Sequence, residues 1–388
     1  GNPAISSMAI GRYFKAEGIT SLVHFTCKDR SRNEMQGQMY EMQIEELENL
    51  LVMSGDIQNT GFEGAAIQTF DLDPVNTLRL SNSMNEGLVV HGRKGDTRET
   101  ASHFFPGAVV NPFKYREGEI VPQYLKLEKK LIAGARYIIT QVGYDARKMQ
   151  ELLFYTKERG YDVPMIANIF LVTKPAANMM RKGAIAGCYI NDELMATLEE
   201  ESAINKEQKG YAREKRVERA AKMVAIARGL GYAGVHLGGF GMDAKTVVEI
   251  LDEAERIGDD WRTWAKEINY GMPGGDYLYK PEFDADGNPT GLNTHEHATM
   301  NEDITGRSLY KKYGLSRFFH HWVLTQEYNE DRTEVKHVRF NKILAKRMDS
   351  LEKRKGINRE HGLEHMGKAL LYGCIDCGDC GLEPVVYS

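Results

Sequence analysis

Short apolar segments alternate with segments of helical periodicity over the first 258 residues of the chain. The apolar runs are nearly continuous, rich in β-branched or aromatic residues, and end in polar or glycine-containing turns. They are GITSLVHFTC, NLLVMSGD, PGAVVNPF, RYIITQVGYD, VPMIANIFLV and YAGVHLGGFG. Runs of this kind are typical of strands buried on both faces, and strands that alternate with helices predict a parallel sheet.

Helical spacing predicts several helices between these strands. In NEMQGQMYEMQIEEL three methionines recur at four and three residues, which indicates a core-facing stripe because methionine at this spacing usually fills a core. DARKMQELLFYTKERG is expected to end at Gly160. REKRVERAAKMVAIARGLG is expected to be closed by Gly229 and Gly231.

The alternation favours an α/β fold of the (β/α)8 TIM-barrel type. A closed barrel needs eight strands, whereas six are predicted here, and DAKTVVEILDEAERIG is the last helical stretch before the pattern ends. We therefore expect residues 1–5 to be a loop entering a helix, and the natural chain to extend upstream of Gly1 by two strands that carry a carboxylate. Without them, strand edges and an apolar interior would be exposed.

The composition changes near Asp259, which predicts a barrel of residues 1–258 and a C-terminal domain of residues 259–388. Within the second part, PEFDADGNPTG predicts an exposed hairpin or loop. Three closely spaced cysteines, Cys374, Cys377 and Cys380, predict a metal site there, because their thiolates can turn toward one centre. Zinc is favoured, with an iron–sulfur cluster or three free thiols as alternatives. A fourth ligand would come from beyond the last residue, from Cys27 or from a histidine.

Composition and charge argue against several classes of protein. The chain has 388 residues, 42% of them apolar and 27% charged, which predicts an ordinary globular core. Its net charge of −5 offers no concentrated basic face for nucleic acid. No apolar run approaches the roughly 20 residues that span a bilayer, and no signal-peptide pattern opens the chain. Five cysteines do not make a disulfide framework in this length, which favours a reducing, cytoplasmic setting.

Polar residues stand where most of the predicted strands end, and in a (β/α)8 barrel these ends form the active site. Any one of them could be a simple turn residue, but a matching set at several strand ends favours a ligand site. The residues selected in this way are His24, Thr26, Asp56, Asn111, Gln141 and Tyr144.

The ordered series HFTCKDRSRN, LLVMSGD, AGARYIITQVGYD and VPMIANIF resembles the 5,10-methylenetetrahydrofolate reductase family. The family patterns are a His-x-Thr-Cys strand end, a Gly-Asp strand end, and Ala-Gly-Ala followed by Ile-Thr-Gln. The resemblance covers roughly residues 1–258. The remainder resembles the cysteine-bearing domain attached to some bacterial and archaeal relatives.

The resemblance implies an enzyme that reduces 5,10-methylenetetrahydrofolate, or a related methylene-pterin, to the 5-methyl form. It implies a non-covalent flavin, usually FAD with FMN as the alternative. In the implied ping-pong reaction NAD(P)H or a redox partner subunit reduces the flavin, which passes the hydride to the reduced folate. A homo-oligomer or a subunit of a redox complex is the implied assembly, without nucleic acid or membrane.

The resemblance also assigns roles to residues. Asp56 matches an aspartate near the flavin, where negative charge would disfavour the anionic reduced flavin and help stabilise a cationic iminium substrate. Gln141 matches the glutamine that hydrogen-bonds the folate ring, and Tyr144 is assigned to the same substrate. His24 and Thr26 lie on the strand end that contacts the flavin.

Ala108, Asn111, Lys129 and Lys130 fall where the family holds the ribityl and phosphate groups. A lysine can act as a point charge for a pyrophosphate, although a solvated helix face is the alternative for these two.

Two features depart from the family pattern. The Phe-Glu-Phe-Phe-Pro strand that carries the family's catalytic glutamate does not occur in the sequence, so the acid would come from upstream or from elsewhere. The phenylalanine expected after IFLV is replaced by LVTKPAANMM, with Pro175 near its place. Two other functions are therefore kept open: a pterin-dependent methyltransferase on the same barrel type, and a non-catalytic electron-transfer scaffold that uses the C-terminal cysteines.

Overall fold

The computed structural model describes residues 5–56, 61, 64, 67–185 and 187–298, and the statements below concern these residues. The chain divides into a compact unit from Gly1 to Glu296 and a second from His297 to Ser388. Residues 259–296 thus pack with the first unit. The functional division at residue 258 stays a prediction.

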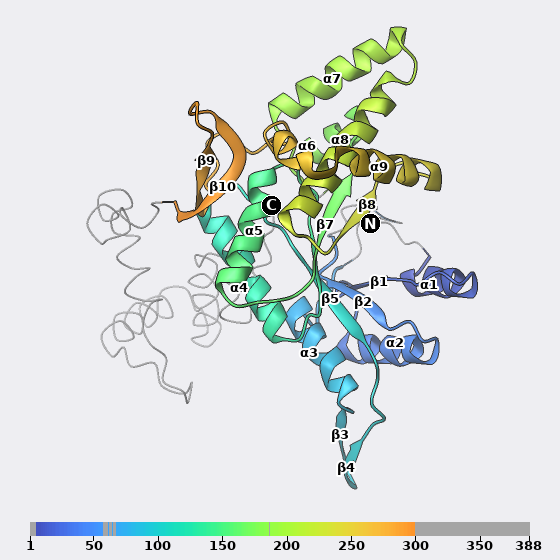
Figure 1. Ribbon diagram of the computed structural model, residues 1–388. Helices are drawn as coiled ribbons and strands as arrows, with labels where there is room; N and C mark the ends of the chain where they lie inside the picture. The colour runs from blue at the N-terminus through green and yellow to red at the C-terminus, as the bar shows by residue number, and fades with distance from the viewer. Residues whose placement is uncertain (1–4, 57–60, 62–63, 65–66, 186, 299–388) are drawn as a thin grey trace, which may run out of the picture. The chain divides into compact units, whose positions relative to one another are not determined.

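Six parallel strands form the central sheet, in the order β1-β2-β5-β6-β7-β8 (Figure 1). Each strand lies within one of the six apolar runs, so the parallel α/β architecture is confirmed. The two further strands of a closed barrel stay a prediction. The bounds are β1 Val23–Thr26, β2 Asn49–Met53, β5 Phe105–Val110, β6 Ile138–Thr140, β7 Met165–Phe170 and β8 Gly234–Gly238.

The sheet is curled, as the wall of a barrel would be. Its strand order follows the chain order, and β1 and β8 are the two edge strands. His24 of β1 and His236 of β8 nevertheless have ring centroids only 6.4 Å apart. Two side chains from opposite edges of a six-stranded sheet come this close only if the sheet bends toward itself.

Helices connect the strands, and polar side chains begin most of them. Ser31, Asp73, Asn191 and Asp243 each accept a hydrogen bond from the amide three residues on. The bounds are α1 Ser7–Ala16, α2 Arg32–Ile44, α3 Pro74–Asn85, α4 Glu117–Ile132, α5 Ala146–Glu158, α6 Lys174–Arg181, α7 Asp192–Glu207, α8 Tyr211–Leu230, α9 Ala244–Ile257 and α10 Trp261–Ala265, with a short 3-10 turn at Gly258–Asp260.

Glycines follow the ends of α5 and α8 as predicted, but one predicted end residue of α8 is wrong. Gly160 follows α5 with φ 74° and Gly231 follows α8 with φ 99°, the left-handed conformation that favours glycine. Gly229 does not close α8, which continues to Leu230. A Cβ at Gly229 would lie 2.3 Å from the ring of Trp261, so this glycine lets the tryptophan approach the helix backbone.

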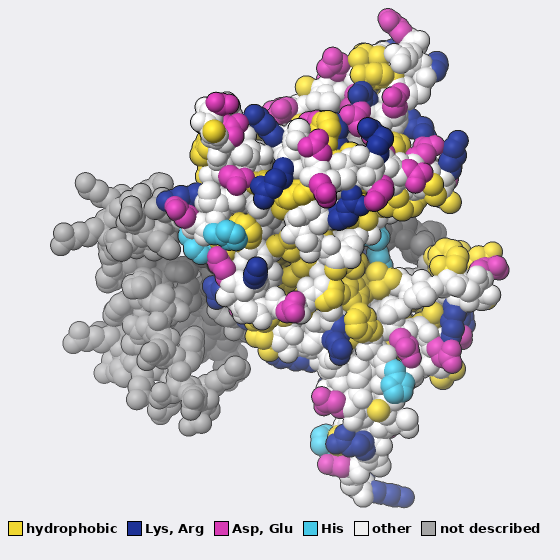
Figure 2. Space-filling model, in the orientation of Figure 1, with side chains coloured by type: hydrophobic (Ala, Val, Ile, Leu, Met, Phe, Trp, Pro, Cys, Tyr) yellow, Lys and Arg dark blue, Asp and Glu magenta, His cyan; other side chains and the backbone are white. Residues whose placement is uncertain are grey.

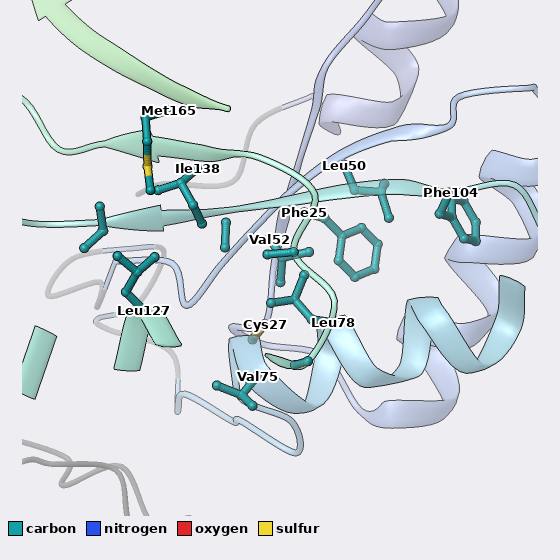
Figure 3. Packing of buried hydrophobic residues seen from close by; sticks show 14 of the residues in the cluster. Phe25, Cys27, Leu50, Val52, Val75, Leu78, Phe104, Leu127, Ile138 and Met165 are labelled. Carbon is teal, nitrogen blue, oxygen red and sulfur yellow. The ribbon is translucent and has the colours of Figure 1, made fainter. Parts of the chain in front are cut away.

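Apolar side chains cover one face of the sheet and the helices packed on it (Figure 3). Phe25, Leu50, Val52 and Ile138 are each at most 2% exposed in this core, and the methionine stripe of α2 belongs to it as predicted. The opposite face has a smaller apolar cluster of Leu51, Tyr137 and Ile139. Directly paired residues of neighbouring strands share a face, so His24, opposite Leu51, lies on this second face.

Two hairpins extend from this framework. β9 Tyr279–Phe283 and β10 Pro289–His297 confirm the hairpin predicted from PEFDADGNPTG. β3 Val89–Gly92 pairs with β4 Gly95–Arg98 in a hairpin that the sequence did not indicate, because every one of its residues is exposed and no apolar alternation marks it. Among the described residues, no helix is both long and apolar enough to cross a bilayer.

Candidate functional site

Polar side chains from several strand ends meet beside Gly187 and Cys188, in the segment between α6 and α7. Asn111, after β5, donates from Nδ2 to the Gly187 carbonyl oxygen at 3.0 Å. A Cβ at Gly187 would lie 2.9 Å from Nε2 of Gln141, the residue after β6. Gly187 has φ 74°, so its backbone conformation and its lack of a side chain both suit this close approach.

Asp56 follows β2, and its charge acts on Cys188 of the same segment. Its side chain is exposed. Burial raises the pKa of the Cys188 thiol to about 11, and the negative charge of Asp56 contributes to the increase. The charge of Asp56 therefore reaches the Cys188 thiol, while Asn111 and Gln141 lie directly against Gly187. The structure brings together these three residues, which the sequence selected from separate strands.

Internal hydrogen bonds orient two of these side chains. Asn111 Oδ1 accepts from the Phe113 amide at 3.0 Å, so its Nδ2 faces Gly187. Gln141 Oε1 accepts from the Val142 amide at 2.8 Å, which turns its Nε2 toward the same glycine. Both amides are thus held in one orientation before any ligand arrives.

His24 and Thr26 lie along β1, on the sheet face opposite the main core. His24 is exposed and Thr26 is half-buried. Thr26 Cβ lies 3.3 Å from the position of a Cβ at Gly55, which has φ 91° and precedes Asp56. The ends of β1 and β2 therefore lie against each other, and they present His24, Thr26 and Asp56 on one side.

A histidine–asparagine pair on the same sheet face was not selected from the sequence. Asn168 of β7 and His236 of β8 are directly paired residues, and His236 Nδ1 lies 3.0 Å from Asn168 Oδ1. The asparagine oxygen can only accept, so Nδ1 carries the proton in this hydrogen bond. Burial lowers the pKa of His236. The pKa of His24 is also lowered, first because the surrounding protein partly desolvates its ring, which still reaches solvent, and then because of the charge of His236. The sequence could indicate this pair only through the alternation of side chains between the two faces of each strand, which places Asn168 and His236 on one face.

Four other selected residues do not lie with this group. Ala108 is fully buried in the main core, and Tyr144 is 3% exposed with its hydroxyl donating to the Phe170 carbonyl at 2.8 Å. Lys129 and Lys130 occupy the last turn of α4. Because α4 starts after β5 and ends before β6, this turn lies at the opposite edge of the sheet. Lys130 is buried there, and its Nζ donates to the Val109 carbonyl at 2.9 Å.

Residues 268–279, called the cover segment below, lie over the ends of β5 and β6. The Tyr270 amide donates to the Tyr144 carbonyl at 2.7 Å, and the Asp276 amide to the Tyr115 carbonyl at 2.9 Å. A small cavity of about 20 Å³ lies beneath it, with Lys114 in its wall. Lys114 is a cation near a strand end that the sequence pattern did not single out. The cover segment leaves this part of the edge with little room for a ligand.

The described residues contain no group of three or more histidine, cysteine, aspartate or glutamate side chains placed to bind a metal. Cys374, Cys377 and Cys380 lie outside the described residues. The zinc site therefore stays a prediction.

The family model of methylenetetrahydrofolate reductase matches residues 2–255, a range that includes all six strands of the sheet and nearly all of α9. No curated protein matches the chain.

Proposed function

The chain belongs to the methylenetetrahydrofolate reductase family, and from this premise we propose that it is a flavin-dependent oxidoreductase. Its substrate would be 5,10-methylenetetrahydrofolate or a related methylene-pterin, reduced to the 5-methyl form. The observation that carries the proposal is that Asn111 and Gln141, from two different strand ends, lie against Gly187, next to a cysteine that the charge of Asp56 from a third strand end reaches. In parallel α/β barrels this edge is where ligands bind.

Gln141 is suited to recognise the pterin ring. The ring edge of a reduced folate presents amide-like donors and acceptors, and a glutamine amide offers one of each. The hydrogen bond from the Val142 amide to Gln141 Oε1 fixes which atom faces the ligand side. The Gln141 side chain therefore loses little conformational entropy when the ring binds.

Asp56 would act through its charge. Its exposed carboxylate lies near residues 187–188, and a negative charge there would stabilise a substrate that becomes a cationic iminium ion. Asn111 would hold the segment with Gly187 in place through its hydrogen bond of 3.0 Å.

The ring of a flavin, which would supply the hydride when bound, would lie at the ends of β1 and β2. His24 and Thr26 are accessible beside Asp56, and the lowered pKa of His24 keeps its imidazole neutral near pH 7, able to donate and to accept. The role of Lys129 and Lys130 at the flavin phosphates stays a prediction: both stand in the last turn of α4, and Lys130 Nζ is engaged with the Val109 carbonyl of β5. The proposal for the flavin thus rests on the residues around its ring.

Anaerobic flavin spectroscopy on the full chain tests this function. We expect the purified protein, after incubation with FAD or FMN, to show the visible spectrum of a bound flavin. NADH, NADPH or reduced ferredoxin should bleach it, and 5,10-methylenetetrahydrofolate or its methanopterin counterpart should restore it. A protein that binds neither flavin, or a reduced flavin that neither methylene-pterin reoxidises, would contradict the proposal. Methyl transfer from a methyl-pterin to a corrinoid would then support the methyltransferase.

A further inference from the structure

Polar side chains form a row across β5, β6, β7 and β8, in these strands or directly after them. The row consists of Asn111, Gln141, Asn168 and His236. Its first two members stand next to each other, because β5 and β6 pair up to the residues that precede them, at positions 110 and 140. Half of the row thus belongs to the candidate site described above, and the other half continues it toward the edge of the sheet.

Strand register carries the row from β6 to β8. Ile139 pairs with Ile166, so two residues further along each strand Gln141 and Asn168 stand next to each other on the same face. Asn168 then pairs directly with His236 of β8, the strand beside β7 (Figure 1). The Asn168–His236 pair is therefore the direct continuation of Gln141 along the sheet.

Each side chain of this pair keeps one open polar atom. His236 Nδ1 donates to Asn168 Oδ1 at 3.0 Å, so Nε2 of the neutral ring can accept and Asn168 Nδ2 can donate. Neither Nε2 nor Nδ2 forms a hydrogen bond with a residue that the structure describes. Both side chains are half-buried, and neither atom is sealed from solvent, because Arg219 Nη1 is the one buried, unpartnered side-chain nitrogen or oxygen of the described residues.

We propose that Asn168 and His236 form a second recognition site for the pterin ring, beside Gln141. This inference rests on the proposed function and deepens it. Asn168 Nδ2 would donate to a carbonyl oxygen of the ring, and His236 Nε2 would accept from an adjacent N–H, since the amide-like edge of a reduced pterin presents both groups side by side. The hydrogen bond within the pair fixes both side chains, so little conformational entropy is lost on binding.

The place of the pair in the row favours the substrate over the flavin. A flavin ring also carries adjacent N–H and carbonyl groups, but the proposed function puts it at the ends of β1 and β2. The pair instead follows Gln141, the residue assigned to the pterin, in the register of β6, β7 and β8. The experiment below separates the two ligands.

The acceptor at Nε2 requires that the His236 ring be neutral. Burial lowers the pKa of His236, which keeps Nε2 unprotonated near pH 7. His24 of β1 is the titratable side chain that faces this ring, with centroids 6.4 Å apart, and no charged side chain of the described parts of β7 and α8 contributes to the shift. A carboxylate at position 168 would reverse the direction, because a negative charge beside Nδ1 favours the imidazolium ion.

Binding of 5-methyltetrahydrofolate, or of its methanopterin counterpart, to the oxidised, FAD-loaded full chain tests the inference. Perturbation of the flavin absorbance reports the Kd of the pterin, and flavin fluorescence reports the Kd of FAD. His236→Phe removes the acceptor and should raise the pterin Kd about tenfold, the effect of losing one hydrogen bond, with the FAD Kd unchanged. His103→Phe, at an exposed histidine that precedes β5 at the other edge of the sheet, should leave both constants unchanged.

Asn168→Asp gives a readout that a merely structural role would not move. The new carboxylate should raise the pKa of His236, and the imidazolium Nε2 donates instead of accepting. Between about pH 8.5 and pH 6 the pterin Kd of this variant, divided by that of the wild type, should therefore rise as the pH falls. Should His236→Phe fail to fold, Asn168→Asp decides alone, and a constant ratio of one would refute the inference.

The outcomes separate this inference from the proposed function. A wild type that binds FAD but neither pterin would overturn both. A wild type that binds a pterin no more tightly than His236→Phe does would overturn the inference alone. Weakened FAD binding in His236→Phe, with the pterin Kd unchanged, would assign the pair to the flavin and would also overturn it.

Discussion

Polar side chains are exposed at the ends of β1 and β2, whereas those of α5 beneath the cover segment are buried and paired. At the β1–β2 ends, His24 and Asp56 are exposed, and they face the side on which a ligand would bind. Under the cover segment, Lys148 and Glu151 of α5 are 3% and 0% exposed, and they lie 3.0 Å apart. Figure 2 shows a third situation, with charges of both signs interspersed over α7, α8 and α9 in solvent.

Contacts of the buried pair tie α5 to the cover segment and to α4. Glu151 accepts from the Tyr124 hydroxyl at 3.1 Å and from the Leu278 amide at 2.5 Å. Lys148 donates to the Asp276 carbonyl at 2.7 Å. Buried polar groups that are fully partnered hold structure, whereas accessible ones at a strand end remain available to a ligand. A polar side chain is therefore a candidate for ligand binding only if it is also exposed and not fully engaged by protein partners.

The largest expected effect is on stability, at the buried pair. Glu151→Ala leaves the Lys148 ammonium buried without its counter-ion, which should lower the free energy of unfolding by about 3–5 kcal/mol. Urea denaturation measures this. The double variant Lys148→Met/Glu151→Met removes both charges and should recover much of the loss, because apolar replacements of a buried pair are often neutral. A double variant as unstable as the single one would show that the charge is not the cause.

The second-largest expected effect is on the rate of substrate reduction, at the exposed Asp56. Asp56→Asn should keep the fold and the flavin, with the free energy of unfolding changed by less than about 0.5 kcal/mol. It should slow reduction of the one-carbon substrate by about 10²–10³-fold, the range for removing one electrostatic stabiliser. Stopped-flow reoxidation of the reduced flavin measures it, with Asp259→Asn, an exposed acid far along the chain, as control. Wild-type turnover in Asp56→Asn would remove the aspartate from the mechanism.

The smallest effect is a pH dependence of stability from His24 and His236. Both have a folded-state pKa below the ordinary value, mainly because the surrounding protein partly desolvates each ring and disfavours its charged form. As the pH falls below about 6.5 the unfolded chain takes up protons first, so stability present above that pH is progressively lost. In urea titrations between about pH 7 and 5, the double variant His24→Asn/His236→Asn should lose less stability than the wild type.

The sequence located the framework well because its signals are local. A strand buried on both faces needs a continuous apolar run, and each of the six predicted runs contains one strand of the sheet. The hairpin β3–β4 was missed since its exposed residues carry no such constraint. Gly229 was misassigned because a glycine near a helix end usually indicates a cap, whereas here it admits the ring of Trp261 from a distant segment.

By itself, then, the sequence determined the parallel α/β architecture, the family, and which polar residues stand at the ends of β1, β2, β5 and β6. Those properties depend on the order of residues along a short stretch. Only the tertiary structure decided that Asn111 and Gln141 lie against Gly187, that Asn168 pairs with His236, and that Lys130 is buried with its Nζ on the Val109 carbonyl. These contacts depend on strand register and on the direction of helices and loops. Both bring together residues that are far apart in the chain, so no local sequence pattern indicates them.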